Sequence, residues 1–277
     1  MASRCRSSGP PTDTAAVHYL GYRPADRATP FADFYRPEMS ALPTHVVHAL
    51  EHGPQAAPVL PAFEDAAALL DEGPRPTENG FGHLRHGESA VAVLADMPGV
   101  APHMWSWWFG WHGCDSRRYK LWHPRAHVSA RWRDGGDHEG YLGRTSLVRE
   151  YVGSEFTRLA IRFVPPADVG LDASRMNGAV AICARIGSPD LPVDVGWLIH
   201  HVRPTAAGSE MRSRFWLGGR HVQWRARPSA ADRVLRPFAA RQLPDPRDLM
   251  VHCAQEMNHL AGFLPALHRR FAVESHS

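Results

Sequence analysis

DPRDLMVHCAQEMNHLAGFLPALHRRF, residues 245–271, is the stretch that decides the fold. Asp245 predicts a helix N-cap, and Pro246 is typical of the first helical position. Pro265 is expected to kink this long terminal helix. Apolar side chains recur at helical spacing and form one stripe, made of Leu249, Cys253, Met257, Leu260, Leu264, Leu267 and Phe271. This stripe has to be buried against another layer of structure.

Strand-like runs supply that layer. They precede the helix at 86–99, 127–132, 144–153, 157–165, 179–187, 193–203 and 210–219. The last two flank PTAAGS and predict a hairpin, and a short aromatic helix is expected at 102–112. This order predicts an α+β fold in which a curved antiparallel sheet grips one long C-terminal helix and encloses a cavity beneath it.

The N-terminal part of the chain has a different character. Residues 1–15 are rich in Ser, Gly, Pro and Thr, which predicts a disordered start, and residues 31–75 carry helical pieces separated by prolines. We therefore divide the chain into 1–75, a disordered start with a small helical region, and 76–277, the main domain.

Composition limits the classes of function. The 277 residues carry a net charge of only +3 with scattered Lys and Arg, which argues against a nucleic-acid partner or an acidic membrane surface. No run approaches the roughly 18 apolar residues of a membrane span. None of the four cysteines lies in a CxxC pair, so we expect reduced thiols in a cytoplasmic protein.

The terminal helix carries a candidate metal-binding pair. His252 and Glu256 are four residues apart and, with His259, flank the apolar stripe. Two readings fit this spacing: two metal ligands on one helical face, or a polar pair along a half-exposed helix edge.

A second candidate lies in a strand. Glu150 shares one face of its strand with Val148 and Val152, so burial would require a cation, either a metal ion or an arginine. The alternative is an edge-strand glutamate that faces water. Glu155 lies outside this alternation and is a weaker candidate.

Histidines complete the donor set. His123 and His127 are both available, and His127 begins an alternating run that would let its ring enter the cavity. One strand histidine, one strand glutamate and the helical pair form a mixed N/O set. Such a set suits zinc, or another first-row divalent ion, better than calcium or magnesium.

Five stretches together carry a resemblance to a known family: PHMWSWWFGWH (102–112), RYKLWHPRAH (118–127), GRTSLVREYVG (143–153), EMRSRFWLGG (210–219) and HCAQEMNHLAGFLP (252–265). Over residues 76–270 the chain resembles the 2,4-diacetylphloroglucinol hydrolases, a group that includes phloretin hydrolase. The resemblance implies a Bet v 1-like helix-grip fold, a zinc ion and a homodimer. It also implies hydrolysis of the carbon–carbon bond between an acyl group and a phenolic ring.

The resemblance also assigns residues. It implies zinc ligation by His127, Glu150, His252 and Glu256, substrate contact by Tyr119, and a histidine near the substrate. We assign that histidine to His200 from its alignment with the following VR, because strand alternation cannot choose between His200 and His201. The family's amide side chain is replaced by Ala130, and a second substrate tyrosine has no counterpart near FWLGGRH. A related acyl-phenol or a polyketide 1,3-dicarbonyl is therefore the predicted substrate class.

Two other functions suit the same fold. A non-catalytic carrier of hydrophobic ligands would have no use for the His/Glu set, and a polyketide cyclase would need no metal. The aromatic cluster of Trp105, Trp107, Trp108 and Trp111 is expected mainly to pack the protein, because one helix cannot direct four indoles at one ligand.

Overall fold

A computed structural model describes residues 19–135, 140–225 and 243–272 of the chain. The described strands form one antiparallel sheet in the order β1-β2-β8-β7-β6-β5-β4-β3, and β9 pairs with β7. The strands are β1 (Gly80–His83), β2 (Glu88–Pro98), β3 (His127–Trp132), β4 (Thr145–Val152), β5 (Glu155–Val164), β6 (Val180–Gly187), β7 (Val193–Thr205), β8 (Gly208–Gly218) and β9 (Gln223–Trp224).

The hairpin predicted at PTAAGS joins β7 to β8. Thr205 is the register partner of Gly208, so the two residues between them make the turn. Gly208 has φ of 151°, and a Cβ there would meet the Met97 carbonyl oxygen and the Gly99 nitrogen at 2.5 Å. A glycine is therefore required where the hairpin passes the end of β2.

The terminal segment folds as two helices, α5 (Pro246–Ala261) and α6 (Leu264–Phe271). The Asp245 side chain accepts a hydrogen bond from the Arg247 backbone N–H, which confirms the predicted N-cap. The predicted kink is also confirmed, because α5 ends before Pro265, which lies in the first turn of α6. Every member of the predicted apolar stripe is buried.

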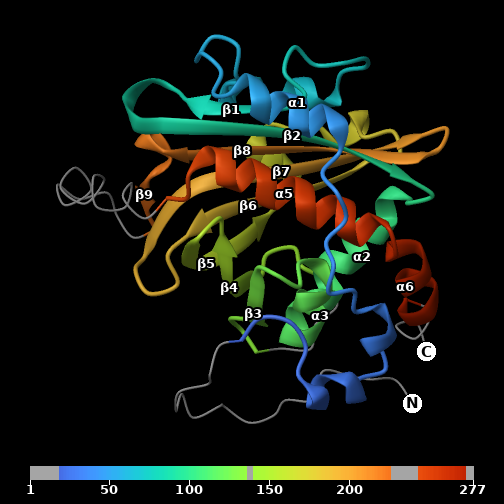
Figure 1. The fold of residues 1–277 in the computed structure, drawn as a ribbon. Helices are drawn as coiled ribbons and strands as arrows, with labels where there is room; N and C mark the ends of the chain where they lie inside the picture. Colours follow the sequence, from blue (N-terminus) through green and yellow to red (C-terminus); the bar gives the residue numbers. More distant parts are fainter. Residues whose placement is uncertain (1–18, 136–139, 226–242, 273–277) are drawn as a thin grey trace.

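Helix α5 lies across one face of the curved sheet, packed most extensively on β2 (Figure 1). The apolar stripe and the inward side chains of the sheet form one large core cluster. The predicted α+β architecture, a curved antiparallel sheet gripping a long C-terminal helix, is confirmed.

The other described helices are short. They are η1 (Pro24–Ala28), η2 (Ala32–Phe34), α1 (Thr44–His52), η3 (Phe63–Leu70), η4 (Arg85–Gly87), α2 (Pro102–Trp111), η5 (His112–Cys114), α3 (Ser116–Trp122), η6 (Pro166–Val169), η7 (Ala173–Arg175) and η8 (Gly219–His221). Helix α3 and strand β1 were not predicted, because both are too short to show a period. The helical pieces expected in 31–75 are present, whereas residues 1–15, the start expected to be disordered, lie outside the described residues. The boundary at 75/76 stays a prediction.

The aromatic helix α2 packs the protein, as expected. Trp105 and Trp108 are completely buried, and Trp107 and Trp111 are partly buried against the same core. None of the four borders the cavity described below.

Cys114 corrects one expectation, because it is disulfide-bonded, whereas Cys183 and Cys253 are free and buried. Spacing along the chain could not show this, since no cysteine is near another in sequence. Within the described ranges, no helix is both long enough and apolar enough to cross a membrane.

Candidate metal centre and cavity

The four predicted ligands come from two adjacent strands and from α5. His127 begins β3 and is the direct register partner of Glu150 on β4, just before a bulge in β3. His252 and Glu256 lie one turn apart on α5 and face the same end of the sheet. The strand pair and the helix pair therefore meet where α5 crosses β4.

The donor atoms lie close together in a buried environment. His127 Nε2 is 3.6 Å from Glu150 Oε2 and 3.4 Å from Glu256 Oε2, and His252 Nε2 is 3.8 Å from Glu256 Oε2. His127, Glu150 and His252 each offer one donor atom within 4.8 Å of the others. We call these three residues and Glu256 the His/Glu cluster.

One backbone hydrogen bond sets the chemistry of His127. Its Nδ1 lies 3.0 Å from the carbonyl oxygen of Tyr119, which can only accept, so Nδ1 carries the proton. Nε2 is then left with a lone pair inside the cluster, where it is buried without a hydrogen-bond partner among the described residues. The Tyr119 ring stacks on the imidazole at 3.7 Å between centroids and fixes its plane. This is the arrangement of a histidine prepared to ligate a metal.

Burial makes the cluster unfavourable without a cation. It raises the pKa of Glu150 to about 7 and, helped by the nearby Glu150 charge, holds the pKa of Glu256 well above its usual range. Burial also holds the pKa values of His127 and His252 well below normal, so both rings are neutral. In the described parts of the chain, no Arg or Lys forms an ion pair with either carboxylate, so the arginine alternative weighed for Glu150 finds no support.

A zinc ion fits these residues. Donor atoms about 2.0–2.2 Å from a tetrahedral zinc lie roughly 3.3–3.5 Å apart, close to the spacings within the cluster. Two neutral imidazoles and two carboxylates would also balance the charge of a divalent ion.

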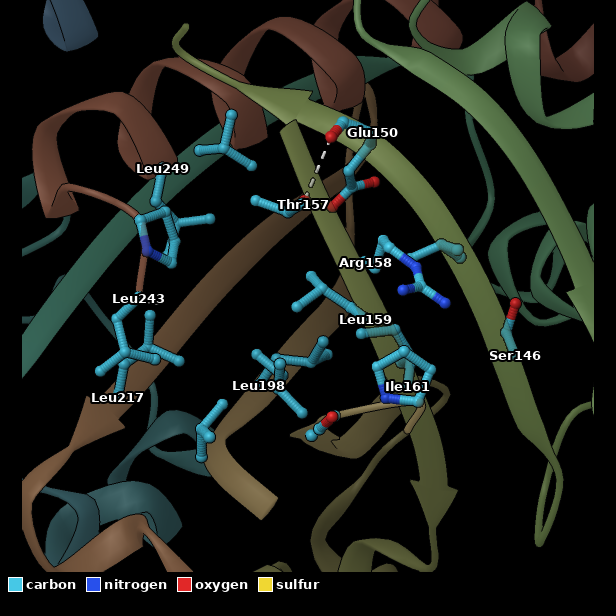
Figure 2. A pocket seen from close by; sticks show the side chains of 18 of the residues that line it. Ser146, Glu150, Thr157, Arg158, Leu159, Ile161, Leu198, Leu217, Leu243 and Leu249 are labelled. Atoms are coloured by element: carbon cyan, nitrogen blue, oxygen red, sulfur yellow. Dashed lines mark hydrogen bonds between the residues drawn. The ribbon is translucent and has the colours of Figure 1, made fainter. Parts of the chain in front are cut away.

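The cluster closes one end of a cavity of about 610 Å³ between the sheet and α5. Figure 2 shows Leu217, Leu243 and Leu249 on one side of this space and Arg158 and Ser146 on the other, with Leu159 and Leu198 between them. The leucines labelled there are Leu159, Leu198, Leu217, Leu243 and Leu249. An apolar chamber with polar groups at one end is typical of a small-molecule site.

Tyr119 and His200 both line this cavity. The Tyr119 hydroxyl donates a hydrogen bond to Glu150 Oε2, and burial raises its pKa well above 10, so it keeps its proton. His200 lies 2.8 Å from the Ser213 hydroxyl through Nδ1, and burial lowers its pKa to about 3. His201 is on the opposite face of β7 and does not border the cavity.

The other candidates from the sequence lie outside the His/Glu cluster. The His123 ring stacks on His252 at 4.9 Å, and its Nε2 is 3.3 Å from the Gln255 side-chain oxygen. His259 accepts from the Ser40 backbone N–H, and Glu155 is an exposed residue that lines part of the cavity. Ala130 is buried in the core and brings no polar side chain.

His112 was not predicted from the sequence, although its buried ring lines the cavity beside Tyr119. Its position at the end of the aromatic helix could have indicated a cavity residue. The four neighbouring tryptophans instead made packing the simpler interpretation of this stretch.

The chain is similar in sequence to known proteins over most of its length. A family model described as "DAPG hydrolase PhiG domain" matches residues 59–269. A 2,4-diacetylphloroglucinol hydrolase from Pseudomonas sp is 32% identical over 92% of both chains. The phloretin hydrolase of Eubacterium ramulus is 27% identical, covering 90% of this chain and 93% of its own. Among solved structures, Ara h 8.0201 covers 63% of this chain and 99% of its own at 10% identity and a TM-score of 0.35, and no conclusion rests on it.

Proposed function

We propose that this chain, which belongs to the 2,4-diacetylphloroglucinol hydrolase family, is a zinc-dependent hydrolase of acylated phenols. It would cleave the carbon–carbon bond between an acyl group and a phloroglucinol-type ring, as in 2,4-diacetylphloroglucinol or a related acyl-phenol. The observation that carries this proposal is the buried His/Glu cluster, which closes one end of a largely apolar cavity in a chain of this family.

The overall reaction balances as a hydrolysis. The oxygen of one water becomes bonded to the acyl carbon, the bond from that carbon to the ring breaks, and the ring carbon receives the electron pair and a proton. The products are a carboxylic acid and the deacylated phenol. An electron-rich phenol makes protonation of the ring carbon feasible.

His127, Glu150, His252 and Glu256 would hold the zinc ion. When bound, zinc supplies polarisation of the acyl carbonyl and lowers the pKa of a water toward about 7. The Tyr119 carbonyl keeps His127 in the tautomer that presents Nε2, and the Tyr119 hydroxyl orients the Glu150 carboxylate.

Tyr119 and His200 are the residues we propose to contact the substrate. The Tyr119 hydroxyl holds a proton at neutral pH at the cluster end of the cavity. His200 offers a neutral imidazole in the sheet wall, held through Nδ1 by Ser213. Both can bind and orient phenolic oxygens while the apolar lining excludes water from the ring.

Metal content and product analysis test the proposal. Protein purified without chelator is expected to contain about one zinc per chain, which Glu256→Ala loses. Asn258→Ala is the matched control, because Asn258 lies on the same helix, outside the cluster, bonded to the Ala41 carbonyl. Chromatography should show the carboxylic acid and the deacylated phenol from 2,4-diacetylphloroglucinol or phloretin. A zinc-loaded protein that cleaves neither these nor any other acyl-phenol would contradict the function.

Two finer properties are also proposed, the first from the family resemblance and the second from the composition of the sequence. We propose a homodimer and a cytoplasmic location. Sedimentation of the purified protein tests the first, and a mass of one chain would contradict it. Fractionation of the producing cells tests the second.

A further inference from the structure

His112 is a cavity residue for which the proposed mechanism has no role. It begins η5, directly after the aromatic helix α2, and the residue is only 3% exposed. The ring nevertheless lines the cavity, together with Tyr119 and His200. A buried imidazole next to a ligand chamber is a polar group whose hydrogen bonds have to be accounted for.

The hydrogen bonds of His112 fix its tautomer. Nδ1 lies 2.9 Å from the carbonyl oxygen of Trp108, so Nδ1 carries the proton and donates it. Nε2 has no hydrogen-bond partner among the described residues. It is nevertheless accessible, because it is not among the described side-chain atoms that are buried without a partner. Nε2 is therefore open to the cavity that the ring lines. Burial lowers the pKa of His112 to about 4, so at neutral pH this nitrogen is an acceptor.

Ring contacts place His112 between the metal centre and His200. On one side it stacks on Tyr119 at 5.7 Å between centroids, and Tyr119 stacks on His127. On the other side Phe109 touches both His112 at 5.7 Å and His200 at 5.8 Å. These five rings make a continuous aromatic wall. Two open imidazole groups lie on this wall, on either side of Phe109.

We propose that His112 is a substrate-binding residue whose Nε2 accepts a hydrogen bond from a phenolic hydroxyl of the substrate ring. This inference rests on the proposed function, because an acyl group held at the His/Glu cluster would leave the ring against this wall. A ring hydroxyl can donate to Nε2, whereas a hydrogen or a methoxy group at the same position cannot. His112 would therefore select polyhydroxylated over partly hydroxylated acyl-phenols.

The test compares the wild type with His112→Phe and His112→Gln. Phenylalanine keeps a ring for the stack with Trp108 and Tyr119 but removes the acceptor, and glutamine supplies a carbonyl acceptor. Zinc content and melting temperature establish that both variants are folded and loaded. Rates are measured with 2,4,6-trihydroxyacetophenone, 2,4-dihydroxyacetophenone and 2,6-dihydroxyacetophenone, and calorimetry measures binding of phloroglucinol, which has no acyl group to lose.

The expected result is a loss of discrimination. His112→Phe should reduce the ratio of kcat/KM between the trihydroxy ketone and at least one dihydroxy ketone by about tenfold and weaken phloroglucinol binding by a similar factor, whereas His112→Gln should recover most of both. The rings differ in intrinsic reactivity, but this difference is the same for both enzymes and cancels when the ratio of the wild type is divided by the ratio of the variant. Unchanged ratios and unchanged phloroglucinol binding in His112→Phe would overturn the inference and leave the proposed function intact. If the wild type cleaves none of the three ketones, calorimetry alone decides the role of His112, and the proposed function fails only if 2,4-diacetylphloroglucinol and phloretin are not cleaved either.

Discussion

Replacing Glu150 by glutamine should stabilise the metal-free protein, with an effect that grows with pH. Burial raises the folded-state pKa of Glu150 from 4.5 to about 7, so between these values the folded state binds more protons than the unfolded state. Stability of the metal-free protein therefore falls as pH rises through this window. Glutamine has no charge to bury, and its side-chain oxygen can still accept the hydrogen bond of Tyr119.

The size of the effect follows from the pKa difference. A folded-state pKa of about 7 against the ordinary 4.5 destabilises the metal-free folded protein by about 3 kcal/mol once the pH is above the folded-state value. At pH 5 the same destabilisation is only about 1 kcal/mol. The stabilisation by Glu150→Gln should thus grow by about 2 kcal/mol between pH 5 and pH 8. For a domain of this size that is a relative gain of roughly 5 °C in melting temperature.

The assay is thermal unfolding of chelator-treated protein across this pH range. Glu155→Gln is the matched control, because this carboxylate is exposed at the cavity, and its substitution should change stability by less than about 0.5 kcal/mol. With zinc restored at 100 times its dissociation constant, the wild type should gain about 3 kcal/mol, whereas the variant, which has lost a ligand, should gain less, so the advantage of the variant at pH 8 should be largely cancelled. A lower melting temperature for metal-free Glu150→Gln at pH 8 would refute the account of Glu150 as a buried carboxylate awaiting a cation.

Three further substitutions test other parts of the structure. Tyr119→Phe should retain zinc, which plasma mass spectrometry measures. Its kcat should fall at least about tenfold, because the variant loses the proton that the Tyr119 hydroxyl holds beside Glu150. An unchanged kcat would contradict the proposed contact with substrate. Asp194→Ala should destabilise the protein by about 3–5 kcal/mol in denaturant unfolding, because it strands the buried guanidinium of Arg185; a change below 1 kcal/mol would show that this pair is solvated. Asp245→Ala should cost about 1 kcal/mol in the same experiment by removing the cap of α5, and Asp245→Asn should restore most of it.

The local pattern of the sequence was sufficient to predict the helix that carries His252 and Glu256 and the strand that carries Glu150. The spacing of His252 and Glu256 in a capped helix places both on one face, whatever the helix packs against. The alternation of Val148, Glu150 and Val152 likewise points all three to one side of β4, and all three are buried. These results follow from the periods of the helix and the strand, which are properties of the backbone and need no tertiary information.

Only the tertiary structure decided how these elements meet. His127 and Glu150 face each other because the β3–β4 register pairs them, and the tautomer of His127 depends on a carbonyl from the short helix α3. His200 rather than His201 lines the cavity, although both faces of β7 are apolar in sequence. Register, strand facing and the contacts of short helices are set by which surfaces pack together across distant parts of the chain. The sequence by itself therefore determined the helix, the strand and the faces on which His252, Glu256 and Glu150 lie, and packing determined the cluster, the cavity and the open nitrogen of His112.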